Sequence, residues 1–188
     1  MPRPLIFLGG VSASGKTYLA SAVKRAVPSC LHFSAGELIS RELAQSTTED
    51  GYQRPQVAND QQANLFQELL LLALTRLDWT IPTILDGHFV VPTRAGPSQV
   101  ATEVIARIDP RELWLLQATA PIIAERLKNR GTSPRWWDGT MAMLDRLLAA
   151  ERKSAEEASR LLGLPLRIAE SGSEDELAIA VTSLASSA

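Results

Sequence analysis

Short apolar runs alternate with amphipathic segments along most of the chain, and this alternation predicts its secondary structure. The apolar runs are typical of buried strands and lie at residues 4–8, 30–33, 80–86, 112–118 and 164–169. Segments with the apolar spacing of helices lie at residues 16–27, 34–44, 56–77, 99–107, 121–130, 137–162 and 173–184. Because strands alternate with helices, we expect an α/β fold of three layers, with a central parallel five-stranded sheet and helices on both faces. A nucleotide would bind at the carboxyl ends of the strands.

Local signals set the limits of several of these segments. Ser34 followed by Glu37 forms a capping box, which predicts that a helix begins here. The leucine-rich run at residues 69–74 predicts a helix end that is buried nearly all round. Residues 45–55 and 87–98 contain polar residues, glycine and proline, and we expect both stretches to be irregular.

Residues 10–17 carry the most specific motif in the chain. Their sequence, Gly-Val-Ser-Ala-Ser-Gly-Lys-Thr, fits the phosphate-binding P-loop pattern G-x-x-x-x-G-K-[ST]. The expected strand before the motif and helix after it allow backbone N–H groups to converge on phosphate at the positive end of a helix. We expect Lys16 to reach the β- and γ-phosphates and the Thr17 hydroxyl to bind Mg²⁺. The alternative is a chance match in an ordinary turn.

Asp86 stands at the end of the third expected strand, directly after hydrophobic residues. This is the Walker B arrangement, in which the carboxylate holds Mg²⁺ directly or through water. Asp86 is therefore a candidate partner of Thr17 at one metal ion. The alternative is an aspartate that only caps a turn.

Three arginines provide candidate groups for stabilising a transferring phosphoryl group. Arg126 and Arg130 are four residues apart and share one face of an expected helix, and Arg135 follows a Gly-Thr-Ser-Pro stretch. Guanidinium groups stabilise the negative charge that develops on the phosphoryl group during transfer. The alternative is a solvated basic helix end, which the helix dipole also favours.

The span between the second strand and the long helix, residues 34–57, is a candidate site for the phosphoryl acceptor. It begins with a small polar helix start and contains Arg54, a possible partner for an anionic acceptor. The alternative is a plain surface excursion of the chain.

Composition adds limits on the class of protein. A length of 188 residues suits a single domain, residues 1–188. The formal net charge of −2 gives no strong nucleic-acid signal. Cys30 is the single cysteine, so an intrachain disulfide is impossible and a reducing, cytoplasmic location is expected. No apolar run is long enough for a membrane span, and the first residues lack the apolar region of a signal peptide.

Four segments, taken in order, identify a family resemblance. They are residues 10–17, Ser-Ala-Gly-Glu at 34–37, Asp-Gly-His at 86–88 and Glu-Arg-Leu-Lys-Asn-Arg-Gly at 125–131. In this combination the chain resembles nucleoside monophosphate kinases, and within them the archaeal-type and atypical nuclear-type adenylate kinases. The resemblance covers nearly the whole chain. The Asp-x-His pair points to this branch, because ordinary adenylate kinases carry a Gly-Phe-Pro-Arg run after that aspartate.

The resemblance implies ATP and Mg²⁺ as cofactors and a nucleoside monophosphate, AMP, as the acceptor. The residues expected at the ATP site are Gly10, Ala13, Ser14, Gly15, Lys16, Thr17, Tyr18 and Arg130. The residues expected to bind the acceptor are Ser34, Gly36, Arg54, His88, Arg94 and Arg135. Residues 129–139 would form a short lid that excludes water and so suppresses ATP hydrolysis.

Several departures from the family pattern leave other functions open. Ser12 and Ala13 stand where the family has Pro and Gly, and this form of the loop is closer to gluconate-type and other small-metabolite kinases. Those kinases usually carry an acidic turn after the second strand, which residues 34–36 do not reproduce. A Gly-Tyr-rich loop is also replaced at residues 89–97. A small-metabolite kinase, or an ATP-driven switch that acts on a protein partner, therefore remains an alternative.

Three further side chains have two interpretations each. His88 is either a catalytic neighbour of the metal or an ordinary hydrogen-bonding residue beside a turn. Trp136 and Trp137 either stack on adenine in a closed lid or pack against the helix that follows them.

Overall fold

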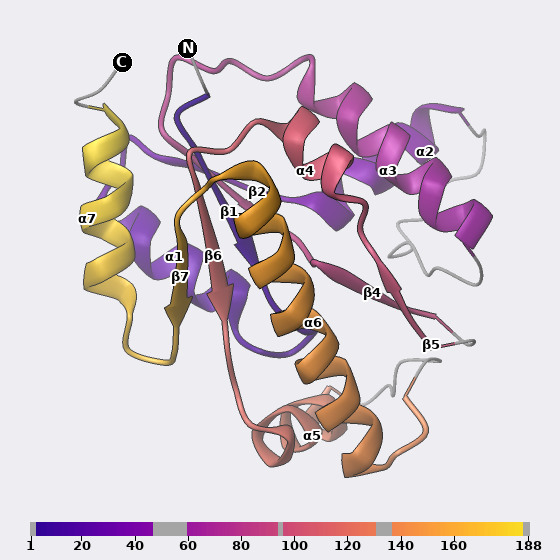
Figure 1. Cartoon of the computed structure of the whole chain (residues 1–188). Coiled ribbons are helices and arrows are strands. Elements are labelled where there is room, and N and C mark those ends of the chain that lie inside the picture. The colour runs from indigo at the N-terminus through magenta and orange to yellow at the C-terminus, as the bar shows by residue number, and fades with distance from the viewer. Residues whose placement is uncertain (1–2, 47–59, 94–95, 131–136, 186–188) are drawn as a thin grey trace.

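A computed structural model describes residues 3–46, 60–93, 96–130 and 137–185 (Figure 1). The strands are β1 Leu5–Gly9, β2 Leu31–Ser34, β3 Thr83–Asp86, β4 Val90–Thr93, β5 Gly96–Gln99, β6 Glu112–Leu116 and β7 Leu166–Ala169. The helices are α1 Lys16–Ala26, α2 Ala35–Ser46, α3 Asp60–Leu74, α4 Thr102–Ile108, α5 Ala120–Asn129, α6 Met141–Leu162 and α7 Glu174–Ala185.

Five strands form one parallel sheet in the order β2-β3-β1-β6-β7. In its register Leu8 of β1 and Ser34 of β2 both pair with Asp86 of β3. The P-loop after β1, the start of α2 after β2 and the segment after β3 therefore leave the sheet side by side at its carboxyl edge. The expected α/β fold, with a central parallel five-stranded sheet, is confirmed.

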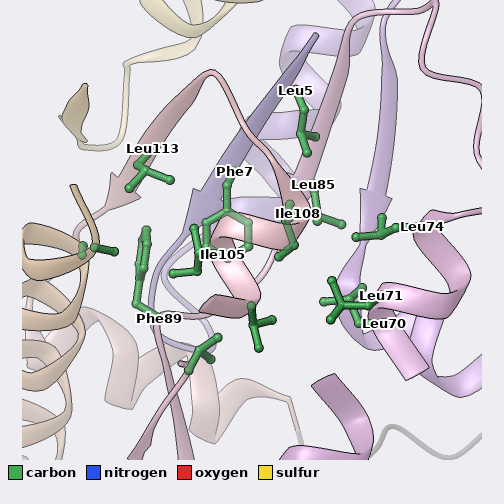
Figure 2. Packing of buried hydrophobic residues seen from close by; sticks show 14 of the residues in the cluster. Leu5, Phe7, Leu70, Leu71, Leu74, Leu85, Phe89, Ile105, Ile108 and Leu113 are labelled. Atoms are coloured by element: carbon green, nitrogen blue, oxygen red, sulfur yellow. The ribbon is translucent and has the colours of Figure 1, made fainter. Parts of the chain in front are cut away.

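Side chains of the central strands alternate between two helical layers. Leu5 and Phe7 of β1 point to the face that α3, α4 and α6 cover, as Figure 2 shows for α3 and α4. Ile6 and Leu8 point to the opposite face, which α1 and α7 cover. Strands buried on both faces are the physical reason for the near-continuous apolar runs in the sequence.

A two-stranded antiparallel hairpin, β4 and β5, corrects the expectation of an irregular stretch at residues 87–98. Pro92 pairs with Pro97 in this hairpin, so the two residues without an N–H face each other. An isolated two-stranded ribbon tolerates proline where a central strand does not. Val90 and Thr93 are buried, so the hairpin is part of the packed structure.

Two helices differ from what the sequence predicts, α3 in its burial and α6 in its first residue. The leucine-rich end of α3 is not buried all round, because Leu72 is 45% exposed while Leu71 and Leu74 are buried. The helix expected from residue 137 begins at Met141. Asp138 accepts hydrogen bonds from the Thr140 amide and hydroxyl, and Thr140 caps the helix through the Met143 amide.

The described helices include none that is long and apolar enough to cross a membrane.

Candidate functional site

The P-loop lies between β1 and α1, at the carboxyl edge of the sheet. Gly15 caps α1 with a φ of 111°, a left-handed conformation that favours glycine. Ala13 has a φ of 69°, which is unusual for a residue with a Cβ. Strained backbone of this kind is concentrated at ligand-binding loops. Ala13 thus adopts the left-handed conformation at the position where the resembling family has glycine.

Lys16 lies across this loop. Its side chain is buried, and Nζ donates hydrogen bonds to the carbonyls of Gly10, at 2.5 Å, and Val11, at 3.2 Å. Burial lowers the pKa of Lys16, while the carboxylates of Asp86 and Glu151 act to raise it. The side chain is therefore held against the P-loop, where the charges of two acids favour its ammonium form.

Arg126 contacts the backbone of the same loop. Its Nη1 lies 3.1 Å from the Ala13 carbonyl oxygen and 2.6 Å from the Ser14 carbonyl oxygen. The side chain is half-buried, so it is not the solvated helix end that the sequence left open. Arg130 follows α5 and is close enough to Lys16 for its charge to lower the pKa of that lysine.

A cavity of about 500 Å³ opens beside the P-loop. The loop, the start of α1, the end of α5 and the chain after β7 enclose it. Its lining residues are Ala13, Ser14, Gly15, Tyr18, Leu19, Leu116, Arg126, Asn129, Arg130, Glu170, Ser171 and Glu174. Six residues expected at the ATP site or in catalysis thus share one cavity: Ala13, Ser14, Gly15, Tyr18, Arg126 and Arg130.

Asp86 is buried on the other side of Lys16. Its Oδ2 lies 2.7 Å from Nε2 of His32, a residue of β2. Burial acts to raise the pKa of Asp86, but the His32 hydrogen bond and the Lys16 charge outweigh it and lower that pKa. Asp86 is therefore a carboxylate at neutral pH, and its Oδ2 is engaged with His32.

His88 follows Asp86 by two residues and is close to Lys16. Burial and the Lys16 charge lower the pKa of His88 to about 3, and the charge of Asp86 only partly opposes them. The imidazole is therefore neutral at physiological pH and has no positive charge to offer an anionic acceptor. Its Nδ1 is shielded from solvent and finds no hydrogen-bond partner within the described ranges.

Glu151 of α6 also contacts the site, from the helical layer on the opposite face of the sheet to α1. Its Oε1 accepts hydrogen bonds from the amides of Gly10 and Phe89, both at 2.9 Å, and its Oε2 accepts one from the Val90 amide at 2.7 Å. Burial raises the pKa of Glu151 to about 7, although the three amides and Lys16 favour its charged form.

Sequence reasoning missed both His32 and Glu151. Glu151 falls on the apolar stripe of α6, between Leu147 and Ala155, and a carboxylate at such a position is a detectable signal. His32 has no comparable signal, because its role depends on which strand lies beside β3.

The expected acceptor residues are only partly described. Ser34 ends β2 beside Asp86, and Gly36 lies in the first turn of α2. Arg54, Arg94, Arg135 and Trp136 lie outside the described residues. So do residues 47–57 of the expected acceptor span and residues 131–136 of the expected lid. Trp137 is buried against α5 and α6, so it packs in the core.

The donor site fits a nucleotide phosphate group in a specific respect. Ser14 Oγ is buried and has no hydrogen-bond partner among the residues that the structure describes. An unpaired buried hydroxyl in a P-loop is a donor that a phosphate oxygen can satisfy. Lys16 and the positive end of α1 supply the matching charge.

The donor set also fits Mg²⁺. Thr17 is exposed at the first turn of α1, and Asp86 supplies one carboxylate. The described part of the chain has no group of three His, Cys, Asp or Glu side chains arranged to hold a metal. Mg²⁺ often binds through one or two carboxylates, water and substrate phosphates rather than in an all-protein cage. Thr17 and Asp86 would hold it in this way.

Comparisons with known proteins agree with this geometry. The AAA domain family model matches residues 9–142. No curated protein matches the sequence. Shikimate kinase from Acinetobacter baumannii, in complex with shikimate, is similar in structure, with a TM-score of 0.58 and 14% identity over 98% of this chain and 94% of that one. YorR protein from Bacillus subtilis, in complex with phosphorylated GDP, has a TM-score of 0.53 and 18% identity over 97% of this chain and 95% of that one.

The family match includes the P-loop, Asp86 and the arginines of α5. At these identities the structural similarities establish the fold and not the substrate. The chain belongs to the AAA domain family and has the P-loop kinase fold.

Proposed function

We propose that the protein transfers the γ-phosphoryl group of ATP, in the presence of Mg²⁺, to a nucleoside monophosphate. The observation that carries this proposal is the hydrogen bonding of Lys16 Nζ to the Gly10 and Val11 carbonyls of the P-loop, with Asp86 near enough for its charge to raise the pKa of Lys16. Arg126 and Arg130 approach the same loop from α5. Charge for a transferring phosphoryl group and a carboxylate for Mg²⁺ therefore meet at one edge of the sheet.

Each group would have a distinct role in the transfer. Lys16 and Arg130 would stabilise negative charge on the phosphoryl group, and Arg126 would hold the loop that binds the ATP phosphates. Mg²⁺, when bound, would neutralise phosphate charge. No covalent intermediate is needed, because positioning and electrostatic stabilisation account for this chemistry.

The acceptor site would lie on the β2 side of Asp86, next to Ser34 and His88. Asp-Gly-His at residues 86–88 favours a nucleoside monophosphate through the family resemblance, and AMP is the expected one. The phosphorylated GDP in complex with YorR shows that a protein of similar structure binds a nucleotide. The shikimate bound by the Acinetobacter kinase is a precedent for a small-metabolite acceptor.

A panel of acceptors tests the proposal. Purified protein with Mg·ATP is offered AMP, CMP, UMP, deoxynucleoside monophosphates, gluconate or shikimate, and ADP and the phosphorylated product are both measured. The Lys16→Ala variant, purified in the same way, controls for contaminating kinases. We expect rapid ADP formation with at least one nucleoside monophosphate and none above background with the variant.

Two results would replace the proposal by a named alternative. Product formed only from gluconate or shikimate would identify a small-metabolite kinase. ADP released at the same rate without any acceptor would identify an ATPase, and a protein partner that changes that rate would make it an ATP-driven switch.

A further inference from the structure

Glu151 is a buried ionisable residue in the middle of α6 that the proposed transfer does not use. Its side chain is 1% exposed. The neighbouring positions on this face of the helix, Leu144, Leu147, Ala155 and Ala158, are apolar and buried. A carboxylate is costly in such a place unless its oxygens are hydrogen-bonded. Glu151 is thus retained where an apolar residue would be the simplest choice for packing.

The three amides that bind Glu151 belong to two separate segments of the site. Gly10 opens the P-loop, while Phe89 and Val90 follow directly after residues 86–88. Oε1 bridges the two segments, because it accepts hydrogen bonds from both Gly10 and Phe89. One carboxylate therefore links the phosphate-binding loop to the chain that carries the metal-binding aspartate.

Side-chain packing strengthens the same link. The Phe89 ring lies so close to Gly9 that a Cβ at position 9 would be 2.2 Å from Phe89 Cε2. The ring also packs edge-on against Phe7, with 5.1 Å between the ring centroids. The backbone on either side of the link is therefore closely packed.

We propose that Glu151 is a positioning residue that fixes the separation between the P-loop and Asp86, so that one Mg·ATP complex engages both. This proposal rests on the proposed nucleotide site. It predicts that Glu151 matters more for binding nucleotide with Mg²⁺, which uses both segments, than for binding nucleotide without it. If Glu151 only stabilised the fold, its substitution would weaken binding of nucleotide with and without Mg²⁺ equally.

Glutamine is the appropriate substitution at this position. Glu151→Gln keeps the shape of the side chain but replaces one acceptor oxygen by an NH₂ donor. Both oxygens accept from backbone N–H groups, so the NH₂ group must replace one acceptor. At the Oε1 position it breaks the bridge between Gly10 and Phe89, and at the Oε2 position it removes the partner of Val90. Glu156→Gln is the matched control, because Glu156 lies on the same helix, is exposed and pairs with Arg152 in an i,i+4 arrangement.

The test measures ATP affinity by calorimetry in two conditions, with Mg²⁺ and with EDTA. We expect Glu151→Gln to weaken Mg·ATP binding roughly ten- to hundredfold, the range seen when groups that support metal ligands are removed. Binding of ATP in EDTA should change much less, and Glu156→Gln should match the wild type in both conditions. Equal weakening in both conditions, or no weakening, would overturn the proposal.

A second measurement on the wild type decides the matter if Glu151→Gln does not fold. Amide hydrogen exchange is followed by NMR at Gly10, Phe89 and Val90, with ATP alone and with Mg·ATP. We expect Mg·ATP to slow exchange at all three amides together, and a response at Gly10 alone would refute the link. Neither measurement needs an acceptor. If the protein binds Mg·ATP but transfers no phosphate, the proposed function is wrong, and the role of Glu151 can still be tested.

Discussion

His32 and Asp86 form a hydrogen bond across two adjacent strands, with 2.7 Å between Nε2 of the histidine and Oδ2 of the aspartate. The bond fixes the orientation of the carboxylate that ends β3. It also helps to keep the pKa of Asp86 low, against the effect of burial. His32 of β2, which is not itself an expected metal ligand, thus orients the carboxylate of Asp86, which is one.

Loss of this bond should weaken the use of Mg²⁺. We predict that His32→Ala raises the Mg²⁺ concentration for half-maximal ADP formation by about ten- to hundredfold, as expected for a group that orients a metal ligand. His32→Gln retains an N–H donor and should show a smaller change. A titration of activity against Mg²⁺ measures both, and identical curves for the wild type and His32→Ala would contradict the assignment.

Arg126 of α5 and Arg130, which directly follows α5, should affect different kinetic constants. Arg130→Ala should lower kcat by about two to three orders of magnitude, the cost of removing a donor that stabilises transition-state charge. Arg126 binds the Ala13 and Ser14 carbonyls. Arg126→Ala should instead raise KM for ATP by about tenfold, because it removes charge-assisted hydrogen bonds that shape the loop. Steady-state kinetics separate the two effects. An unchanged kcat in Arg130→Ala would show that Arg130 is a solvated surface residue with no part in the transfer.

Gly9 should tolerate no side chain. A Cβ there would lie 2.2 Å from Phe89 Cε2, so we predict that Gly9→Ala destabilises the fold by about 1–3 kcal/mol, as overpacking does. Gly36→Ala is the control, because its Cβ would meet nothing closer than Ser34 Oγ at 3.8 Å. Urea denaturation measures both variants. Recovery of stability in the double variant Gly9→Ala, Phe89→Leu would confirm the cause, and a fully stable Gly9→Ala would disprove it.

Glu151 should give the fold a specific pH dependence. Its pKa is about 7 in the folded protein against 4.5 for the unperturbed group. Between these values the folded state holds a proton that the unfolded state has lost. The free energy of unfolding therefore falls as pH rises from 4.5 to about 7, by roughly 3 kcal/mol at ~1.4 kcal/mol per pH unit.

Glu151→Gln removes this contribution. The free energy of unfolding of the wild type, minus that of Glu151→Gln, should fall from pH 4.5 to 7 and stay constant above pH 7. Urea denaturation across this range measures the two profiles, and parallel profiles would show that the Glu151 pKa is not raised.

The fold followed from the sequence because its signals are local. Strands such as β1 and β6 are near-continuous apolar runs, and α5 has proline in its first turn. The β4–β5 hairpin was missed because Pro92 and Pro97 predict a loop, and only their pairing with each other makes a ribbon possible. The start of α6 was placed too early, because the Asp138–Thr140 turn precedes it.

The sequence predicts those residues of the candidate site that belong to known motifs. Lys16 and Asp86 belong to patterns that a sequence displays, and the structure brings them within electrostatic reach of each other. His32 and Glu151 reach the site through strand order and through packing of α6 on the P-loop. Such contacts join residues that are far apart in the chain, so no spacing rule reveals them.

Transfer of label from [γ-³²P]ATP tests the central claim most directly. The wild type, Lys16→Ala and Asp86→Ala are incubated with labelled ATP, Mg²⁺ and AMP, and the products are separated by chromatography. We predict that the wild type places the label in ADP only when AMP is present, and that both variants, folded as judged by circular dichroism, place none. Label that appears only in inorganic phosphate, at a rate that AMP does not change, would contradict the account.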